Sequence, residues 1–262
     1  MHANKRLGQH FLHDPAVIAR IVATIRPQPR EHIVEIGPGR GALTRPLAAS
    51  GTRLSVIELD RALAAALAAD PLLRNVKVIR GDALKMDYTA LAADGLIRIV
   101  GNLPYNISSP LLFRFLDASP HLHDLTLMLQ HEVVERMIAV PATRAYGRLT
   151  VMLAARCRVE KLFIVGAGAF APPPKVESAV VHLVPHADAP FDPGDWALFE
   201  RLVRAGFTAR RKTLRNALAP LADADTIEAA DLDPGARPGT VAAAGYARLA
   251  RLLHDAYTVS LR

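Results

Sequence analysis

Residues 34–42 have the sequence Val-Glu-Ile-Gly-Pro-Gly-Arg-Gly-Ala. The apolar start is typical of a buried strand, the glycines predict a tight turn, and a helix is expected to follow. Such a turn lets backbone N–H groups and a helix N-terminus approach a ligand closely. Gly37, Gly39 and Ala42 also satisfy the dinucleotide fingerprint G-x-G-x-x-G/A. The stretch therefore predicts an α/β fold and leaves open a dinucleotide, another cofactor or a purely structural turn.

On both sides of this stretch, short β-branched runs alternate with amphipathic runs, which is typical of an α/β fold with a mainly parallel sheet. Asp14 followed by Pro15 predicts a capped helix start. Seven strands are predicted, at residues 32–36, 54–58, 76–79, 97–100, 125–129, 161–165 and 178–184, with helices that include 62–69, 110–116 and 133–138. These elements make one complete domain with a seven-stranded sheet.

The composition changes at residues 186–195, where proline and aspartate alternate and neither strand nor helix is expected to persist. We interpret this segment as a linker. Residues 1–185 then form the α/β domain. Residues 196–262 have helical spacing and no strand-like run, so they predict a small all-helical C-terminal domain.

Acidic residues follow the second and third predicted strands of the domain. Glu58 and Asp60 come about twenty residues after the glycine turn, where an acidic side chain can accept both hydroxyls of a ribose. Asp82 ends the next strand, where it could accept a hydrogen bond from an adenine amine of the cofactor. Ligand sites in open α/β sheets lie at such strand ends. These acids still do not distinguish NAD from S-adenosylmethionine.

The fourth strand of the series leads into residues 102–106, Asn-Leu-Pro-Tyr-Asn. The amine of adenine is a poor nucleophile because its lone pair is delocalised into the ring. The Asn102 side chain and a backbone carbonyl near Leu103 could accept hydrogen bonds from the two amine hydrogens and direct the lone pair toward a methyl donor. Tyr105 offers a face on which an extruded base can stack. The segment predicts methyl transfer to an adenine amine.

Composition restricts the class of protein further. The formal net charge is +7 and most of the 32 basic residues are arginine. Arginine favours contact with phosphate and bases, although a GC-rich genome would also favour arginine.

Cys157 is the only cysteine, so an intramolecular disulfide and a cysteine-rich zinc site are excluded. His121 and His123 lack a third ligand nearby, and no metal is expected. No long apolar run or signal peptide is present, so a cytoplasmic protein without membrane contact is expected.

Taken with these motifs, the chain resembles the ribosomal RNA adenine N6,N6-dimethyltransferases of the KsgA type over almost its whole length. The resemblance lies in several separate motifs that occur in the family's order. They are residues 5–12, 35–41, 102–105, 146–149, 170–178 and 207–214. It implies a Rossmann-like S-adenosylmethionine-dependent methyltransferase domain. It also implies dimethylation of two adjacent adenosines in a hairpin loop near the 3′ end of small-subunit (16S) rRNA, late in assembly of the 30S particle.

The resemblance also implies roles for individual residues. Cofactor contacts fall on His10, Leu12, Gly37, Glu58, Asp82 and Asn102, and the pocket for the target base falls on Asn102, Leu103, Tyr105 and Phe170. The family usually has Asn at the position of His10, and a backbone contact to the cofactor would survive that difference. The resemblance further implies a monomer.

Basic residues gather early in the predicted helical domain. Arg210, Arg211, Lys212 and Arg215, with Arg201 and Arg204 before them, form a basic run that an acidic stretch follows. We interpret Arg210, Arg211, Lys212 and Arg215 as RNA-binding, against the alternative of a solvated helix face.

The presence of this C-terminal domain favours an enzyme that acts on small-subunit rRNA over the related enzymes that methylate large-subunit rRNA and confer macrolide resistance. The same motifs are also compatible with a non-catalytic assembly factor on this fold or with an NAD-dependent dehydrogenase.

Overall fold

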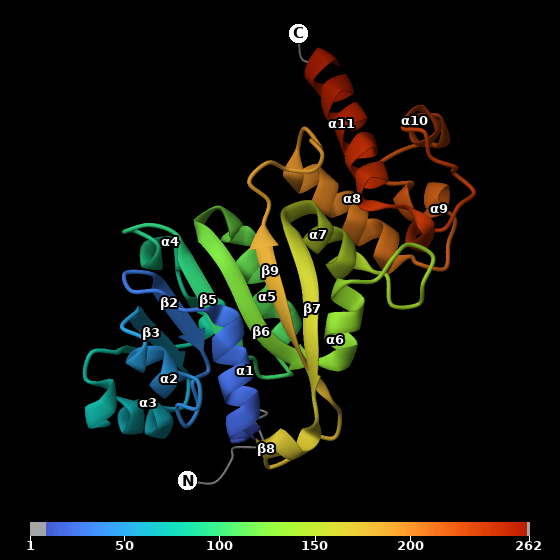
Figure 1. Cartoon of the computed structure of the whole chain (residues 1–262). Coiled ribbons are helices and arrows are strands. Elements are labelled where there is room, and N and C mark those ends of the chain that lie inside the picture. The colour runs from blue at the N-terminus through green and yellow to red at the C-terminus, as the bar shows by residue number, and fades with distance from the viewer. Residues whose placement is uncertain (1–8, 261–262) are drawn as a thin grey trace. The chain divides into compact units, whose positions relative to one another are not determined.

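The computed structural model describes residues 9–260, which divide into two compact units: residues 9–134 with 159–185, and residues 135–158 with 186–260. The first unit is built on a seven-stranded sheet of order β4-β3-β2-β5-β6-β9-β7 (Figure 1). The strands are β2 His32–Ile36, β3 Arg53–Glu58, β4 Lys77–Arg80, β5 Ile97–Asn102, β6 Leu122–Gln130, β7 Cys157–Val165 and β9 Ser178–Pro185. Strands β2 to β6 are parallel and β9 is antiparallel to β6. The predicted seven-stranded, mainly parallel sheet is confirmed.

Helices cover both faces of this sheet. They include α1 Pro15–Ile25, α2 Thr44–Ala49, α3 Arg61–Ala68 and α5 Ser108–Asp117, while α4 Tyr88–Leu91 is short and α6 His131–Met137 runs across the division between the two units. The chain moves outward in one direction from β2 through β3 to β4, and in the other direction from β5 to β6. Because such parallel crossovers are right-handed, α2 and α3 lie on one face and α5 on the other. Figure 1 shows α1 in front of the strands and α5 behind them.

The predicted start of the first helix is confirmed in detail. Asp14 accepts hydrogen bonds from the N–H groups of Ala16 and Val17, and Pro15 occupies the first helical position. Helix α1 buries Ile21 and Ile25 in the main hydrophobic cluster, together with side chains from α2, α3 and the central strands. All five residues of β2 are buried, as expected of a central parallel strand covered on both faces.

Two strand features differ from the sequence prediction. The strand expected at residues 161–165 already begins at Cys157, because β7 lies at the edge of the sheet, where exposed charged residues such as Arg158 and Glu160 are tolerated. A second, two-stranded sheet pairs β1 Phe11–Leu12 with β8 Phe170–Ala171 in antiparallel register. Two residues are too few to give a periodic signal, so the sequence did not predict this pairing.

The second unit is helical in its C-terminal part, as predicted. Its helices are α7 Arg148–Arg156, α8 Trp196–Thr208, α9 Leu214–Leu218, α10 Ala224–Ala229 and α11 Ala243–Ser260. Asp195 caps α8 by accepting from the N–H groups of Ala197 and Leu198. No helix within residues 9–260 combines the length and apolar character needed to cross a membrane.

Residues 135–158 group with this second unit, whereas the sequence division assigned them to residues 1–185. The hydroxyl of Tyr146 donates to the carbonyl of Val241 at 2.9 Å. Arg148 forms an ion pair with Glu200 at 2.6 Å, and α7 packs against α8 and α11. Such contacts between distant segments leave no mark in local composition, so a division at a proline-rich segment could not anticipate them.

Candidate active site

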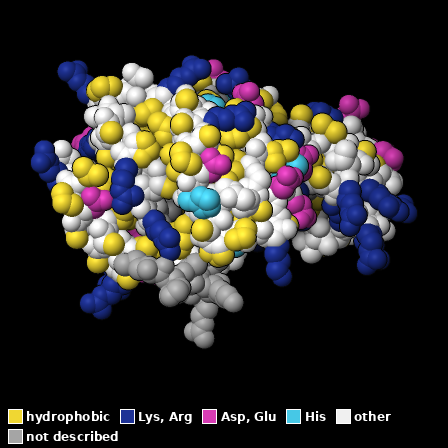
Figure 2. Space-filling model, turned by 60° about the horizontal axis from the view of Figure 1, so that its bottom comes forward, with side chains coloured by type: hydrophobic (Ala, Val, Ile, Leu, Met, Phe, Trp, Pro, Cys, Tyr) yellow, Lys and Arg dark blue, Asp and Glu magenta, His cyan; other side chains and the backbone are white. Residues whose placement is uncertain are grey.

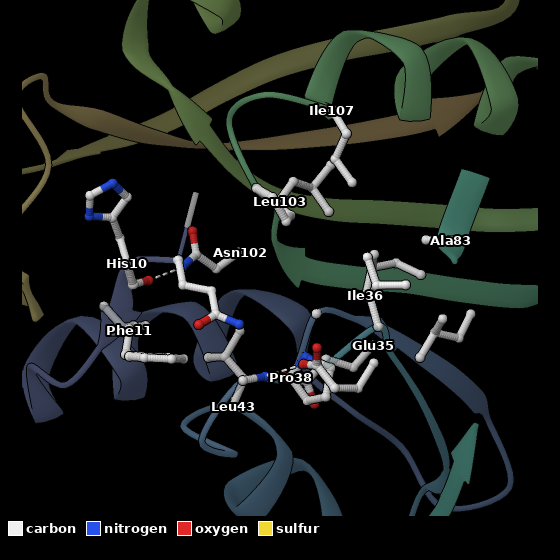
Figure 3. A pocket seen from close by; sticks show the side chains of 18 of the residues that line it. His10, Phe11, Glu35, Ile36, Pro38, Leu43, Ala83, Asn102, Leu103 and Ile107 are labelled. Carbon is white, nitrogen blue, oxygen red and sulfur yellow. Dashed lines mark hydrogen bonds between the residues drawn. The ribbon is translucent and has the colours of Figure 1, made fainter. Parts of the chain in front are cut away.

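A pocket lies at the carboxyl ends of the parallel strands in the first unit (Figure 3). It is lined by the N-terminal segment, the glycine turn after β2, the ends of β3 and β4, and the loop after β5. The sequence-predicted residues that line it are His10, Leu12, Gly37, Glu58, Asp82, Asn102, Leu103 and Tyr105. The structure thus brings together residues spread over almost one hundred positions of the chain.

The floor of the pocket is the glycine turn. Gly37, Gly39 and Gly41 all have positive φ, at 64°, 57° and 79°, a conformation that side chains with a Cβ rarely adopt. A Cβ on Gly39 would also lie 3.1 Å from the ring of Phe11. Gly101, which the sequence analysis did not single out, is needed because a Cβ there would lie 2.5 Å from the Ile36 carbonyl oxygen. The glycines therefore allow the left-handed turn after β2 and the close packing of β5 against the end of β2.

Glu58 ends β3 with a carboxylate that is only 5% exposed. Its Oε2 accepts from the Gly39 N–H at 3.1 Å and its Oε1 accepts from the Asp60 N–H at 2.8 Å. Burial raises the pKa of Glu58, and these backbone donors oppose the rise. Each carboxylate oxygen has a second lone pair, so the group can hold the glycine turn and still accept hydroxyls of a ligand. Asp60 instead caps α3 through the N–H groups of Ala62 and Leu63.

Asp82 lines the pocket from the end of β4, and its Oδ1 accepts from the Leu84 N–H at 3.0 Å. That bond closes a turn and fixes the position of the carboxylate. The residue thus combines a capping role with a place at the pocket wall.

Glu35 is a second buried acid in the pocket wall, and the sequence analysis assigned it no role of its own. It lies on β2, is 2% exposed, and accepts a hydrogen bond from the Thr44 hydroxyl at 2.7 Å. Burial raises the pKa of Glu35 to about 7. A charged residue between apolar neighbours inside a buried strand was the available signal for this group.

Asn102 ends β5, and its Nδ2 donates to the backbone carbonyl of His10 at 3.0 Å (Figure 3). Since only the nitrogen of the amide can donate to a carbonyl, this bond assigns Oδ1 as the acceptor end of the side chain. The neighbouring Leu103 is 1% exposed, and its N–H donates to the Met128 carbonyl at 3.0 Å. The loop that follows β5 is therefore held by both β6 and the N-terminal segment.

The ring of Tyr105 has two defined contacts. Its hydroxyl shares a hydrogen bond of 2.6 Å with the Ser178 hydroxyl at the start of β9. Its face stacks on the imidazole of His10, with 5.5 Å between ring centroids and 27° between planes. Burial raises the pKa of the Tyr105 phenol, so the ring is neutral at physiological pH.

Residues 5–8 of the first family motif lie outside the described residues.

Phe170 differs from the other predicted base-pocket residues. It is 2% exposed and packs in the main hydrophobic cluster with Leu12, its partner in the β1–β8 pairing. Among the residues that the structure describes, those lining the pocket do not include Phe170. The pairing of β8 with β1 places the Phe170 ring against the hydrophobic cluster. Nothing in the sequence indicated this pairing, so the sequence could not show that Phe170 is buried.

The predicted RNA-binding residues all lie in the second unit. Arg211, Lys212 and Arg215 are exposed. Arg210 is exposed as well, but its Nη2 donates to the carbonyls of Thr143 and Arg144, both at 3.0 Å, and so fastens the loop before α7. Figure 2 shows more Lys and Arg than Asp and Glu side chains on the face in view.

Within residues 9–260, no cluster of three or more His, Cys, Asp or Glu side chains could hold a metal ion. Cys157 is buried, and burial raises the pKa of its thiol to about 12. A thiol that remains protonated is a poor nucleophile.

The sequence matches the family model described as Ribosomal RNA adenine dimethylase over residues 1–255. A relative from Pseudomonas aeruginosa named Ribosomal RNA small subunit methyltransferase A is 50% identical over 261 residues, covering 97% of this chain and 95% of its own. A relative of the same name from Xanthomonas campestris is 51% identical over 252 residues, covering 95% of this chain and 96% of its own.

Two solved structures are similar over nearly the whole chain. A dimethyladenosine transferase from Plasmodium falciparum has a TM-score of 0.77 at 25% identity and covers 92% of this chain and 96% of its own. The 23S rRNA methyltransferase ErmE has a TM-score of 0.71 at 29% identity and covers 93% of this chain and 99% of its own. With a family model that matches almost every residue and relatives half identical along their length, the chain belongs to the Ribosomal RNA adenine dimethylase family.

Proposed function

We propose that this protein is the enzyme that transfers methyl groups from S-adenosylmethionine to the N6 amines of two adjacent adenosines near the 3′ end of 16S rRNA, during assembly of the small subunit. The observation that carries the proposal is the position of Asn102. Its amide nitrogen donates to the N-terminal segment, and the residue lines the same pocket as the glycine turn and the acids of β3 and β4.

The pocket residues fit S-adenosylmethionine better than NAD. Glu58 and Asp82 both line the pocket as acidic side chains. Carboxylates suit a ligand with a sulfonium and an ammonium group, whereas they oppose the pyrophosphate of a dinucleotide. The positive-φ glycines let the ligand lie against the backbone, Glu58 would accept the ribose hydroxyls, and Asp82 would accept the adenine amine. His10 and Leu12 would close the pocket from the N-terminal side.

When bound, S-adenosylmethionine supplies an electrophilic methyl group. The protein's contribution is to orient the incoming amine. Asn102 Oδ1 and the Leu103 backbone carbonyl would accept the two amine hydrogens, so that the nitrogen lone pair points at the methyl carbon. Tyr105 would hold the plane of the base. The N6 nitrogen becomes strongly acidic once it is methylated, so no strong base is required, in keeping with a site built from hydrogen-bond acceptors.

The choice of substrate rests on relatives rather than on the fold. ErmE, which acts on 23S rRNA by its title, has nearly the same fold, but at 29% identity. The relatives named for the small subunit are 47% to 51% identical. This difference favours 16S rRNA.

We further propose that residues 186–195 link the methyltransferase domain to a helical domain in residues 196–262. In that helical domain, Arg211, Lys212 and Arg215 would bind RNA phosphates. The enzyme would act as a cytoplasmic monomer.

Mass mapping of rRNA tests this proposal. We expect 16S rRNA from cells that lack the gene to lose N6,N6-dimethyladenosine at two adjacent positions, and the wild-type gene to restore it. The Asn102→Ala variant should fold and bind RNA almost normally while methyl transfer falls by roughly a hundredfold. Loss of methylation in 23S rRNA instead would identify a large-subunit enzyme. Unchanged rRNA of both subunits would favour a non-catalytic assembly factor, and binding of NAD but not S-adenosylmethionine would contradict the assigned chemistry.

A further inference from the structure

His10 contacts three separate parts of the candidate site. Its backbone carbonyl accepts from Asn102 Nδ2 at 3.0 Å. Its ring nitrogen Nδ1 lies 2.8 Å from the carbonyl oxygen of Pro172. Its imidazole stacks on Tyr105. In Figure 3 the ring lies on the opposite side of Asn102 from Glu35 and Pro38, so it points away from the glycine turn.

The hydrogen bond to Pro172 fixes the imidazole. A carbonyl can only accept, so Nδ1 carries the proton and donates. The two residues are held close because Phe11, next to His10, pairs with Ala171, next to Pro172, in the small sheet of β1 and β8. The His10 ring is therefore anchored at its edge and by its backbone, and it presents one face to Tyr105.

Tyr105 is in turn held in two places. Ser178, which is fully buried, fixes the hydroxyl end of the ring, and His10 covers one face. An aromatic ring offers two faces for stacking, so a base that enters the pocket would use the remaining face of Tyr105. The angle of that face then depends on His10.

We propose that His10 is a positioning residue for methyl transfer, whose imidazole sets the plane of Tyr105 while its backbone carbonyl sets the rotamer of Asn102. One residue thus aligns the group that stacks on the target base with the group that accepts its amine. This inference rests on the proposed function. It assigns the His10 side chain to the target-base side of the pocket rather than to the cofactor.

Three variants separate the contacts of the imidazole, and all of them keep the backbone carbonyl that binds Asn102. His10→Phe keeps a ring to stack on Tyr105 but loses the donor to Pro172. His10→Asn keeps a donor but loses the ring, and His10→Ala loses both. Each variant is measured for thermal stability, for S-adenosylmethionine affinity by calorimetry, and for the single-turnover rate with saturating RNA and cofactor.

We expect His10→Ala to bind S-adenosylmethionine normally and to lose roughly tenfold or more in the single-turnover rate, as misplacement of a positioning group does. His10→Phe should recover most of this loss, and His10→Asn should not. In a Tyr105→Ala background, His10→Ala should have little further effect, because coupled residues are not additive. An unchanged rate in His10→Ala, equal loss in His10→Phe, additive losses, or a cofactor affinity that falls as much as the rate would overturn the inference.

The wild-type enzyme separates this inference from the function on which it rests. Absence of N6-methylated product from wild-type protein refutes the proposed function, and the inference falls with it. An active wild-type enzyme with unaffected His10 variants refutes the inference alone.

Discussion

Glu35 makes the stability of the protein depend on pH in a way that can be measured directly. Its carboxyl group is 2% exposed on β2, and burial raises its pKa from 4.5 to about 7. The proton is therefore bound more tightly in the folded state than in the unfolded state. We expect Glu35→Gln, which removes the titrating group and keeps an oxygen to accept from Thr44, to alter the pH profile of unfolding.

The sign and size of the effect follow from this pKa. Below pH 4.5 the carboxyl is protonated in both states. Between pH 4.5 and 7 the unfolded chain loses the proton and the folded chain retains it, so the free energy of unfolding falls as pH rises. The total change corresponds to about 3 kcal/mol. Relative to the wild type, Glu35→Gln should therefore gain about 3 kcal/mol between roughly pH 4 and pH 8, or roughly 6 to 12 °C in Tm.

Thermal unfolding of both proteins, in steps from about pH 4 to pH 8 at constant ionic strength, checks this expectation. Other titrating groups are common to both proteins and cancel in the difference. Glu160→Gln, at an exposed position of β7, is the matched control and should follow the wild type at every pH. Parallel profiles for Glu35→Gln and the wild type would refute the reasoning, since Glu35 would then be ionised in the folded protein without cost.

Two further predictions concern binding. Glu58→Ala should weaken S-adenosylmethionine binding about tenfold or more in a calorimetric titration, because hydrogen bonds to a charged acceptor contribute about 1.5 to 3 kcal/mol; an unchanged Kd would mean that Glu58 only holds the glycine turn. The double variant Arg211→Ala, Lys212→Ala should weaken RNA binding, and the slope of log affinity against log salt concentration should fall by roughly 0.7 to 0.9 per lost contact. The control pair Arg74→Ala, Lys77→Ala removes the same charge at exposed positions of the first unit and should leave RNA binding unchanged. Equal slopes for the two pairs would show that only net charge matters.

Much of the site was predictable because its residues follow strands in a fixed order. Gly37, Glu58, Asp82 and Asn102 each end a predicted parallel strand, and the carboxyl ends of parallel strands meet at one edge of the sheet. Their convergence in one pocket required only the strand order, which crossover handedness restricts to few possibilities. Phe170 lies on the short strand β8 outside that rule, and the structure places it in the core instead of the pocket.

By itself, the sequence determined the periodicities, the capped start of α1, the glycine turn and the position of Asn102 at the end of a strand, because these depend on local conformation and residue type. Only the tertiary structure decided that residues 10–12 pair with residues 170–172, that Tyr146 binds Val241, and that Arg210 fastens the loop at Thr143. It also decided that Glu35 is buried and that His10 stacks on Tyr105. These contacts join residues that are distant in the chain, and their free energy comes from burial and pairing that exist only once the sheet has formed, so no local pattern encodes them.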